Sequence, residues 1–130
     1  MTQRPLKFRA WDKIDGLMYY NIQDGIQFSD KSVYEFRQFL NKGKEDYHEW
    51  GIMQFTGLKD KRGREIYEGD TVYATRRGEE FETKFAVIRW SDYLKCMVVY
   101  SKDTDIDDCL PIGRFYELEI IGNIYEQEQK

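Results

Sequence analysis

The residues of this chain most suited to chemistry are cations gathered at two predicted turns. Lysine and arginine side chains neutralise phosphates, and exposed aromatic rings beside them stack on unpaired bases. If Tyr67, Tyr73 or Trp11 is exposed next to these cations, the turns form a surface for single-stranded nucleic acid. The simpler interpretation, which we favour, is that tight turns carry charge because they face water. The cations in question are Lys59, Lys61, Arg62, Arg64, Arg76 and Arg77.

The overall charge of the chain opposes nucleic-acid binding. The formal net charge is −4 and the pI is about 5.1, whereas affinity for a nucleic-acid backbone comes from basic side chains. Non-specific binding to DNA is therefore disfavoured, and weak binding of single strands by the basic loops stays an alternative function.

The groups that catalysis or metal binding would need are sparse or poorly spaced. The only imidazole is His48, and no serine lies at a Gly-x-Ser-x-Gly turn. The run from Asp103 resembles the start of a calcium loop, but its sixth and twelfth positions hold Asp108 and Arg114 where an EF-hand needs glycine and glutamate. A solvated acidic loop is the better interpretation. We expect no enzyme activity, no cofactor and no metal site, although the many carboxylates leave a carboxylate-based hydrolase open.

The two cysteines and the short apolar runs indicate a cellular location. Neither Cys96 nor Cys109 has a histidine nearby in the sequence that would activate a thiolate, and both are expected to be unpaired thiols in a reducing compartment. No apolar run is long enough to span a bilayer, and the polar, basic N-terminus does not resemble a signal peptide. We therefore expect a cytoplasmic protein with no membrane partner.

Short elements separated by turns are predicted along the chain, in two regions, 1–49 and 50–126. In the first region, Asp15-Gly16 is a strong hairpin dipeptide, and Ser32 and Glu35 have capping-box spacing, which predicts a short helix. The predicted elements of this region are a strand at 6–11, a return strand at 17–20, a short apolar segment at 26–28, a helix at 31–40 and a linker at 41–49.

Glycine and aspartate divide the second region into strands. Asp60 opens a turn that Gly63 closes, and Gly69 precedes Asp70, whose carboxylate is expected to accept bonds from N–H groups just after itself. The alternation of the last strand breaks at Ile121-Gly122, which predicts a β-bulge. Several short strands of this kind are typical of a small barrel or sandwich. The predicted strands are one ending near Thr56, then 64–67, 71–76, 81–90, 95–100 and 116–125.

Aromatic residues make up 16% of the chain, which favours strands over helices. Phe85 and Trp90 are expected to be buried. The remaining aromatic residues exceed what a small core requires, so that some are available for a contact surface.

Three segments of the chain carry recognisable motifs: Lys7–Asp12, Met53–Asp60 with Gly63, Glu65–Asp70 and Val72, and Ile121–Glu126. These segments resemble the YopX family, a group of small proteins encoded by phages and prophages. The resemblance implies one domain over residues 1–130, a mostly β fold with an SH3-like barrel or roll in the C-terminal two-thirds, an N-terminal β-hairpin region with one short helix, and a phage-related origin. It implies no activity, cofactor or catalytic residue.

A compact chain without catalytic groups is expected to act by binding. We therefore predict a non-enzymatic protein-interaction (adaptor) module whose partner is an unidentified host or phage protein, or a second copy of the chain, because short strands leave edges that need covering.

Overall fold

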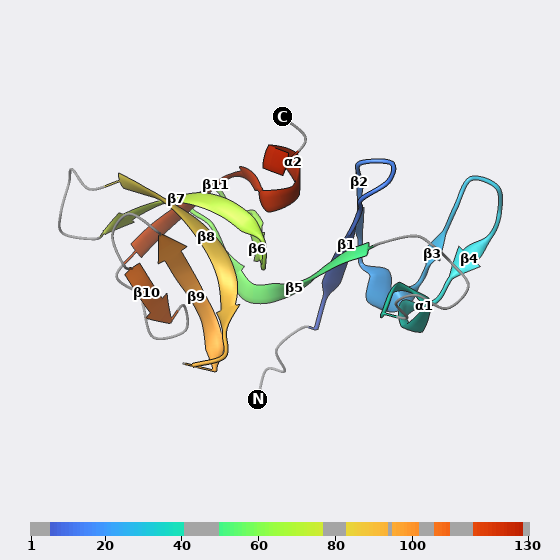
Figure 1. The fold of residues 1–130 in the computed structure, drawn as a ribbon, viewed down its shortest axis with the longest axis horizontal. Coiled ribbons are helices and arrows are strands. Elements are labelled where there is room, and N and C mark those ends of the chain that lie inside the picture. Colours follow the sequence, from blue (N-terminus) through green and yellow to red (C-terminus); the bar gives the residue numbers. More distant parts are fainter. Residues whose placement is uncertain are drawn as a thin grey trace. The chain divides into compact units, whose positions relative to one another are not determined.

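Strands form most of the structure, which is a computed structural model (Figure 1). The mainly β fold predicted from the sequence is confirmed. The chain divides into two compact units, Met1–Phe55 and Thr56–Lys130, whereas the single domain over 1–130 stays a prediction. The residues that the structure describes are 6–40, 50–76, 83–93, 95–101, 106–109 and 116–128.

The first unit contains short antiparallel strands, one 3-10 turn and one short helix. Its elements are β1 (Phe8–Asp12), β2 (Leu17–Tyr20), η1 (Ile22–Asp24), β3 (Ile26–Gln27), β4 (Val33–Tyr34), α1 (Phe36–Leu40) and the beginning of β5 (Trp50–Lys59). Strand β1 pairs with β2 on one side and with β5 on the other, and β3 pairs with β4.

The hairpin between β1 and β2 is closed by an aspartate that precedes the turn. The Asp12 carboxylate accepts hydrogen bonds from the backbone N–H groups of Ile14 and Asp15 at 2.9 and 3.0 Å. Gly16 has a φ of 70°, a conformation that glycine adopts without strain. The predicted Asp15-Gly16 hairpin turn is therefore confirmed.

The helix predicted at 31–40 is wrong in its first half. Strand β4 and a tight turn at Lys31, with a φ of 70°, occupy that half. In the second half, the Gln38 side-chain oxygen accepts a hydrogen bond from the backbone N–H of Glu35 at 2.7 Å, just before α1 begins. This is the back-reaching half of a capping box, so the box begins at Glu35 rather than at Ser32.

Aromatic rings fill the core of the first unit. Phe39 is buried, and its ring centroid lies 4.8 Å from that of Trp50 and 5.7 Å from that of Tyr34. The buried residues Ala10 and Ile22 belong to the same cluster. Large rings supply the apolar area that a unit of this size needs, because each ring buries roughly 150–250 Å².

The second unit is built on a strongly curled antiparallel sheet (Figure 1). Its elements are the end of β5, β6 (Glu65–Tyr67), β7 (Asp70–Arg76), β8 (Thr83–Ser91), β9 (Cys96–Ser101), β10 (Ile106–Cys109), β11 (Tyr116–Asn123) and α2 (Ile124–Glu128). The strand order in the sheet is β10-β9-β8-β7-β11. This curvature is compatible with the SH3-like barrel or roll expected above, and that finer description stays a prediction.

One face of the curled sheet forms the core of the second unit. Alternate residues along each strand point to this face, as the two-residue repeat of a strand requires. The buried cluster consists of Ile66, Val72, Ala74, Ala86, Ile88, Met97, Val99 and Leu118.

Two turns predicted in the second unit are present. In the first, the backbone N–H of Gly63 donates to the carbonyl of Asp60 at 2.9 Å. In the second, Gly69 has a φ of 89°, and the Asp70 carboxylate accepts from the backbone N–H of Tyr67 at 2.8 Å. This bond reaches back across the turn, a direction that was not predicted from the sequence.

The end of the chain combines a bulge with a helix cap. The register between β11 and β7 shifts between Ile120 and Gly122, which confirms the predicted bulge. The strand predicted as far as Tyr125 is too long, because Asn123 ends it: its side-chain oxygen accepts from the backbone N–H groups of Tyr125 and Glu126 at 3.0 Å each. Asn123 is thus the N-cap of α2.

Some expectations fall on residues outside the described ranges. The linker at 41–49, with His48, lies there, as do Arg77 and the start of the acidic run at Asp103. The end of that run was wrongly expected to be a loop, because Asp107 and Asp108 belong to β10. Within the described part of the chain, no helix is both long enough and apolar enough to cross a membrane.

Candidate functional site

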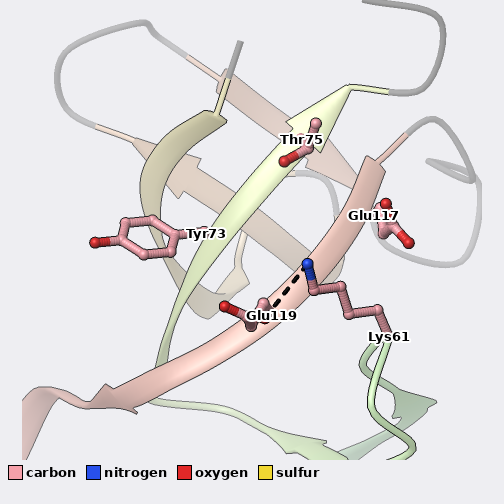
Figure 2. A pocket seen from close by; sticks show the side chains of 5 residues that line it. All are labelled: Lys61, Tyr73, Thr75, Glu117 and Glu119. Carbon is pink, nitrogen blue, oxygen red and sulfur yellow. Dashed lines mark ion pairs between the residues drawn. The ribbon is translucent and has the colours of Figure 1, made fainter. Parts of the chain in front are cut away.

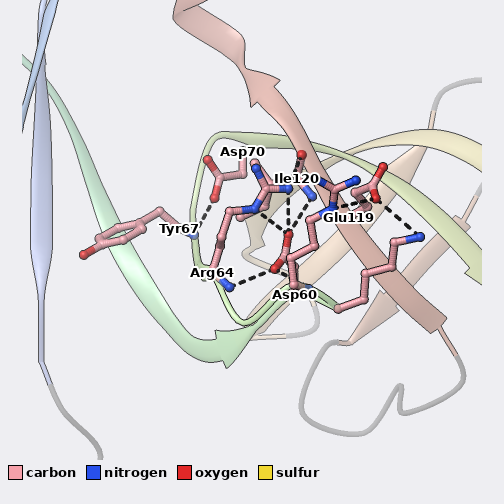
Figure 3. Close-up of polar contacts among 8 residues, drawn as sticks. Asp60, Arg64, Tyr67, Asp70, Glu119 and Ile120 are labelled. Carbon is pink, nitrogen blue, oxygen red and sulfur yellow. Dashed lines mark hydrogen bonds and ion pairs between the residues drawn. The ribbon is translucent and has the colours of Figure 1, made fainter.

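The basic loop between β5 and β6 is organised around a buried carboxylate, that of Asp60 (Figure 3). One oxygen accepts from the backbone N–H groups of Arg62 and Arg64 at 3.0 and 2.9 Å. The other accepts from the Arg64 guanidinium Nε and from the backbone N–H of Ile120, both at 3.1 Å. Asp60 therefore ties its own loop to β11.

These bonds determine the protonation of Asp60. Burial by itself raises the pKa of this carboxyl group, but the backbone donors of Ile120, Arg64 and Arg62, together with the Arg64 side chain, outweigh burial and lower the pKa below its ordinary value of 3.8. Asp60 is consequently an ionised structural group at neutral pH and is not placed to act as a general acid.

Most of the predicted cations of this loop already have acidic partners. Lys61 Nζ and Arg62 Nε lie 3.3 and 3.4 Å from one carboxylate oxygen of Glu119. Arg64 Nη2 lies 3.0 Å from Asp60 and also donates to the carbonyl of Ile120 at 2.7 Å. The positive charge that nucleic-acid binding would require is thus largely neutralised within the second unit.

The other residues of the predicted binding surface do not join this loop in an exposed patch. Trp11 and Tyr67 are 6% and 2% exposed, so neither ring is available to stack on a base. Their expected exposure was wrong, because both faces of β1 are buried and β6 carries its ring inward. Lys59 is exposed at the end of β5, and Arg76 is the last residue of β7. The side chain of Arg76 and all of Arg77 lie outside the described residues.

The exposed aromatic surface lies elsewhere, on the sheet face that points away from the core. Tyr73 and Phe85 are directly opposite each other in the β7–β8 register, and each is 45% exposed. The expected burial of Phe85 and of Trp90, also 45% exposed, was therefore wrong. Tyr73 is also directly opposite Glu119 in the β7–β11 register. We call this surface the outer face; it comprises Tyr73, Thr75, Phe85, Glu117 and Glu119.

A small pocket opens on the outer face between β7 and β11 (Figure 2). It has a volume of about 150 Å³, which is below the usual size of a site for a drug-sized molecule. We call it the outer pocket; it is lined by Lys61, Tyr73, Thr75, Glu117 and Glu119. Its lining combines one aromatic ring, two carboxylates and an ammonium group, which is suited to binding a side chain and contains no paired nucleophile and base.

No metal centre is found in the described part of the chain, because no three residues of the types His, Cys, Asp and Glu gather there as ligands. The cysteine expectation needs correction. Cys96 is disulfide-bonded, not a free thiol. The sequence offered no signal for this bond, because the pairing of strands that positions Cys96 is not readable from the spacing of two cysteines.

The protein-family model described as YopX protein matches residues 7–129 of the chain. The crystal structure of protein EF1440 from Enterococcus faecalis is similar, with 24% identity, a TM-score of 0.59 and 98% of each chain covered. The crystal structure of protein yopX from Bacillus subtilis is similar with 21% identity and a TM-score of 0.56, over 92% of this chain and 93% of that one. No curated protein matches. At these identities the two structures bear on the fold alone.

Proposed function

The chain belongs to the YopX protein family, and we propose that it is a non-enzymatic protein-interaction module of phage or prophage origin. In this proposal the outer face of the second unit docks on a host or phage protein. The observation that carries the proposal is the pair of half-exposed rings, Tyr73 and Phe85, directly opposite each other on neighbouring strands. Water-exposed aromatic pairs of this kind are typical of the centres of protein interfaces.

The composition of the outer face supports a protein partner over a nucleic acid. Glu117 and Glu119 lie next to the aromatic pair, and their carboxylates repel a phosphate backbone. The cations that would counter this repulsion, Lys61 and Arg62, are already paired with Glu119. Single-stranded nucleic acid is therefore the second candidate, and a second copy of the chain is a further possible partner for the same surface.

Location in the host bacterial cytoplasm is part of the proposal. The disulfide at Cys96 counts against it, since the cytoplasm of most bacteria keeps thiols reduced. The redox state of Cys96 therefore bears directly on this part of the proposal.

Photocrosslinking tests the proposal. A photoreactive phenylalanine analogue replaces Tyr73 or Phe85 in the full chain, and replaces Tyr20, an exposed ring of the first unit, as a matched control. We expect one adduct of the same mass at the first two positions and none at Tyr20. Excess unlabelled wild-type protein should suppress that adduct, whereas the double variant Tyr73→Ser, Phe85→Ser should not.

The outcomes separate the candidates. An adduct of twice the chain mass identifies a second copy as the partner, and an adduct with nucleic acid contradicts the protein-interaction proposal. Equal adducts at Tyr20, or equal suppression by the double variant, would show that the outer face is not the docking surface.

A further inference from the structure

We propose that the outer pocket receives a lysine or arginine side chain from the partner protein. This inference rests on the proposed function and adds the chemistry of the partner. It starts from the position of Tyr73, which has an apolar ring on one side, that of Phe85, and a carboxylate on the other, that of Glu119. A long cationic side chain matches this arrangement, because its methylene stem packs on rings while its charged end pairs with carboxylates.

One carboxylate of the outer pocket, that of Glu117, is available to a further cation. Glu119 is 23% exposed and shared by Lys61 and Arg62, so its charge is largely met. Glu117, in contrast, is exposed, and no ion pair or hydrogen bond of its carboxylate exists among the residues that the structure describes. A carboxylate that has no partner among the described residues and lies beside an exposed ring is available to one further positive group.

The pocket already holds a group of the proposed kind. Figure 2 shows the Lys61 side chain reaching over β11 to the Glu119 carboxylate. Lys61 is 45% exposed, and exposed ion pairs contribute only about 0–1 kcal/mol. An incoming cation can therefore share the site or displace Lys61 without a large cost, while Arg62 keeps Glu119 paired.

The same sheet also provides a contact between a cation and a ring. The Arg89 guanidinium on β8 lies 3.5 Å from the ring centroid of Tyr100 on β9. Arg89 alternates with the buried Ile88 and shares the side of β8 on which Phe85 lies. An arginine stacked on Tyr73 would repeat this contact on β7, two strands away from Tyr100. Attraction from the ring quadrupole would then add to that of the carboxylates.

A titration of the isotope-labelled full chain tests the inference. The probes are N-acetyl-arginine amide and N-acetyl-lysine amide, with N-acetyl-glutamate amide as the acidic counterpart, all at constant ionic strength. We expect saturable shifts of the backbone amide signals of Tyr73, Thr75 and Glu117 with the two cationic probes and none with the acidic probe.

Two variants sharpen this test. Glu117→Gln should weaken binding of the arginine probe about two- to fivefold, the factor that one exposed charge contact provides, and Tyr73→Leu should weaken it to a similar degree. The control Asp24→Asn removes an exposed carboxylate from the first unit and changes the net charge equally, and it should leave the dissociation constant unchanged. Because the exposed Glu117 carboxylate has no partner in the part of the chain that the structure describes, Glu117→Gln is expected to fold normally, which the same spectra verify.

Three results would overturn the inference: shifts that grow linearly without saturation, equal shifts with the acidic probe, or a Glu117→Gln variant that binds as the wild type does. In any of these cases, position-specific crosslinking at Tyr73 would still support the proposed function. If the crosslink at Tyr73 is absent while the cationic probes still bind saturably, the pocket binds cations but the outer face is not the docking surface.

Discussion

The buried carboxylate of Asp60 accepts a hydrogen bond from the backbone N–H of Ile120, sixty positions further along the chain, at 3.1 Å. Through this contact the loop between β5 and β6 caps the open edge of β11, where the backbone N–H of Lys61 also donates to the carbonyl of Leu118 at 2.9 Å. Unpaired strand edges invite pairing with other chains. The basic loop is consequently a structural closure first, which explains why its cations have internal partners.

Replacing Asp60 by asparagine should destabilise the protein by about 3 kcal/mol, because several hydrogen bonds to a buried charged acceptor are lost or weakened. Urea denaturation of the full chain measures the change. The matched control is Asp24→Asn, which removes an exposed carboxylate and should cost less than about 0.5 kcal/mol. Equal denaturation midpoints for the two variants would show that Asp60 does not hold the loop.

The contribution of Asp60 to stability should depend on pH in a definite direction. The pKa of this group is lowered in the folded protein, so its contribution is fully present above the pKa of the unfolded chain, about 3.9, and is lost as the pH falls through the lower folded value. The difference in unfolding free energy between wild type and Asp60→Asn should be constant near neutral pH and shrink below about pH 4. A difference that grows on acidification contradicts this assignment.

Gly122→Ala should destabilise the protein by about 1–2 kcal/mol, as overpacking of a tight site does. A Cβ at this bulge would lie 3.2 Å from the buried Thr71 Oγ1 and 3.4 Å from Glu126 Oε2. Thr71 Oγ1 has no hydrogen-bond partner among the described residues, so Thr71→Ala removes the obstruction without breaking a bond. The cost of Gly122→Ala should therefore fall in the Thr71→Ala background, and an unchanged cost in thermal or urea unfolding would place the strain elsewhere.

Protein purified without reductant should have Cys96 in a disulfide. Its intact mass should rise by the mass of two hydrogen atoms on reduction, and an alkylating reagent should label it only after reduction. Cys96→Ser serves as the control, since it should show no such change in the mass of the monomer. Full labelling of the untreated wild type would contradict the bond and would remove the objection to a cytoplasmic location.

Single-stranded oligonucleotides should not bind measurably at physiological salt, because Lys61, Arg62 and Arg64 are paired with Glu119 and Asp60, which offset two of their three charges. Fluorescence anisotropy with a labelled oligothymidine checks this expectation. Salt-dependent binding that weakens in the double variant Lys61→Ala, Arg62→Ala would favour the nucleic-acid alternative.

The sequence allowed the local features to be predicted and left the long-range ones hidden. The turns at Asp15-Gly16 and Asp60–Gly63 and the bulge at Gly122 depend on neighbouring residues, and all were predicted correctly. Which aromatic ring is exposed depends on what covers each strand. Phe85 was therefore expected in the core and Trp11 was a candidate for exposure, opposite to what the structure shows.

The candidate site could be predicted only in part, because its contacts join residues that are far apart in the sequence. Lys61 was identified from the sequence, but its partner Glu119 lies fifty-eight positions away and meets it through the fold. Tyr73 was one of three aromatic residues that the sequence offered as exposed. The residues next to it in the sequence do not indicate that it lies between Phe85 and Glu119. The strand register supplies that information.

The measurement that tests the central claim most directly is the yield of the crosslinked adduct at Tyr73 relative to that at Tyr20, with wild type or the Tyr73→Ser, Phe85→Ser variant as competitor. The outer face as a protein-docking surface predicts a single protein adduct at Tyr73, suppressed by the wild type and not by the variant. Equal yields at the two positions, or equal suppression by both competitors, would contradict it.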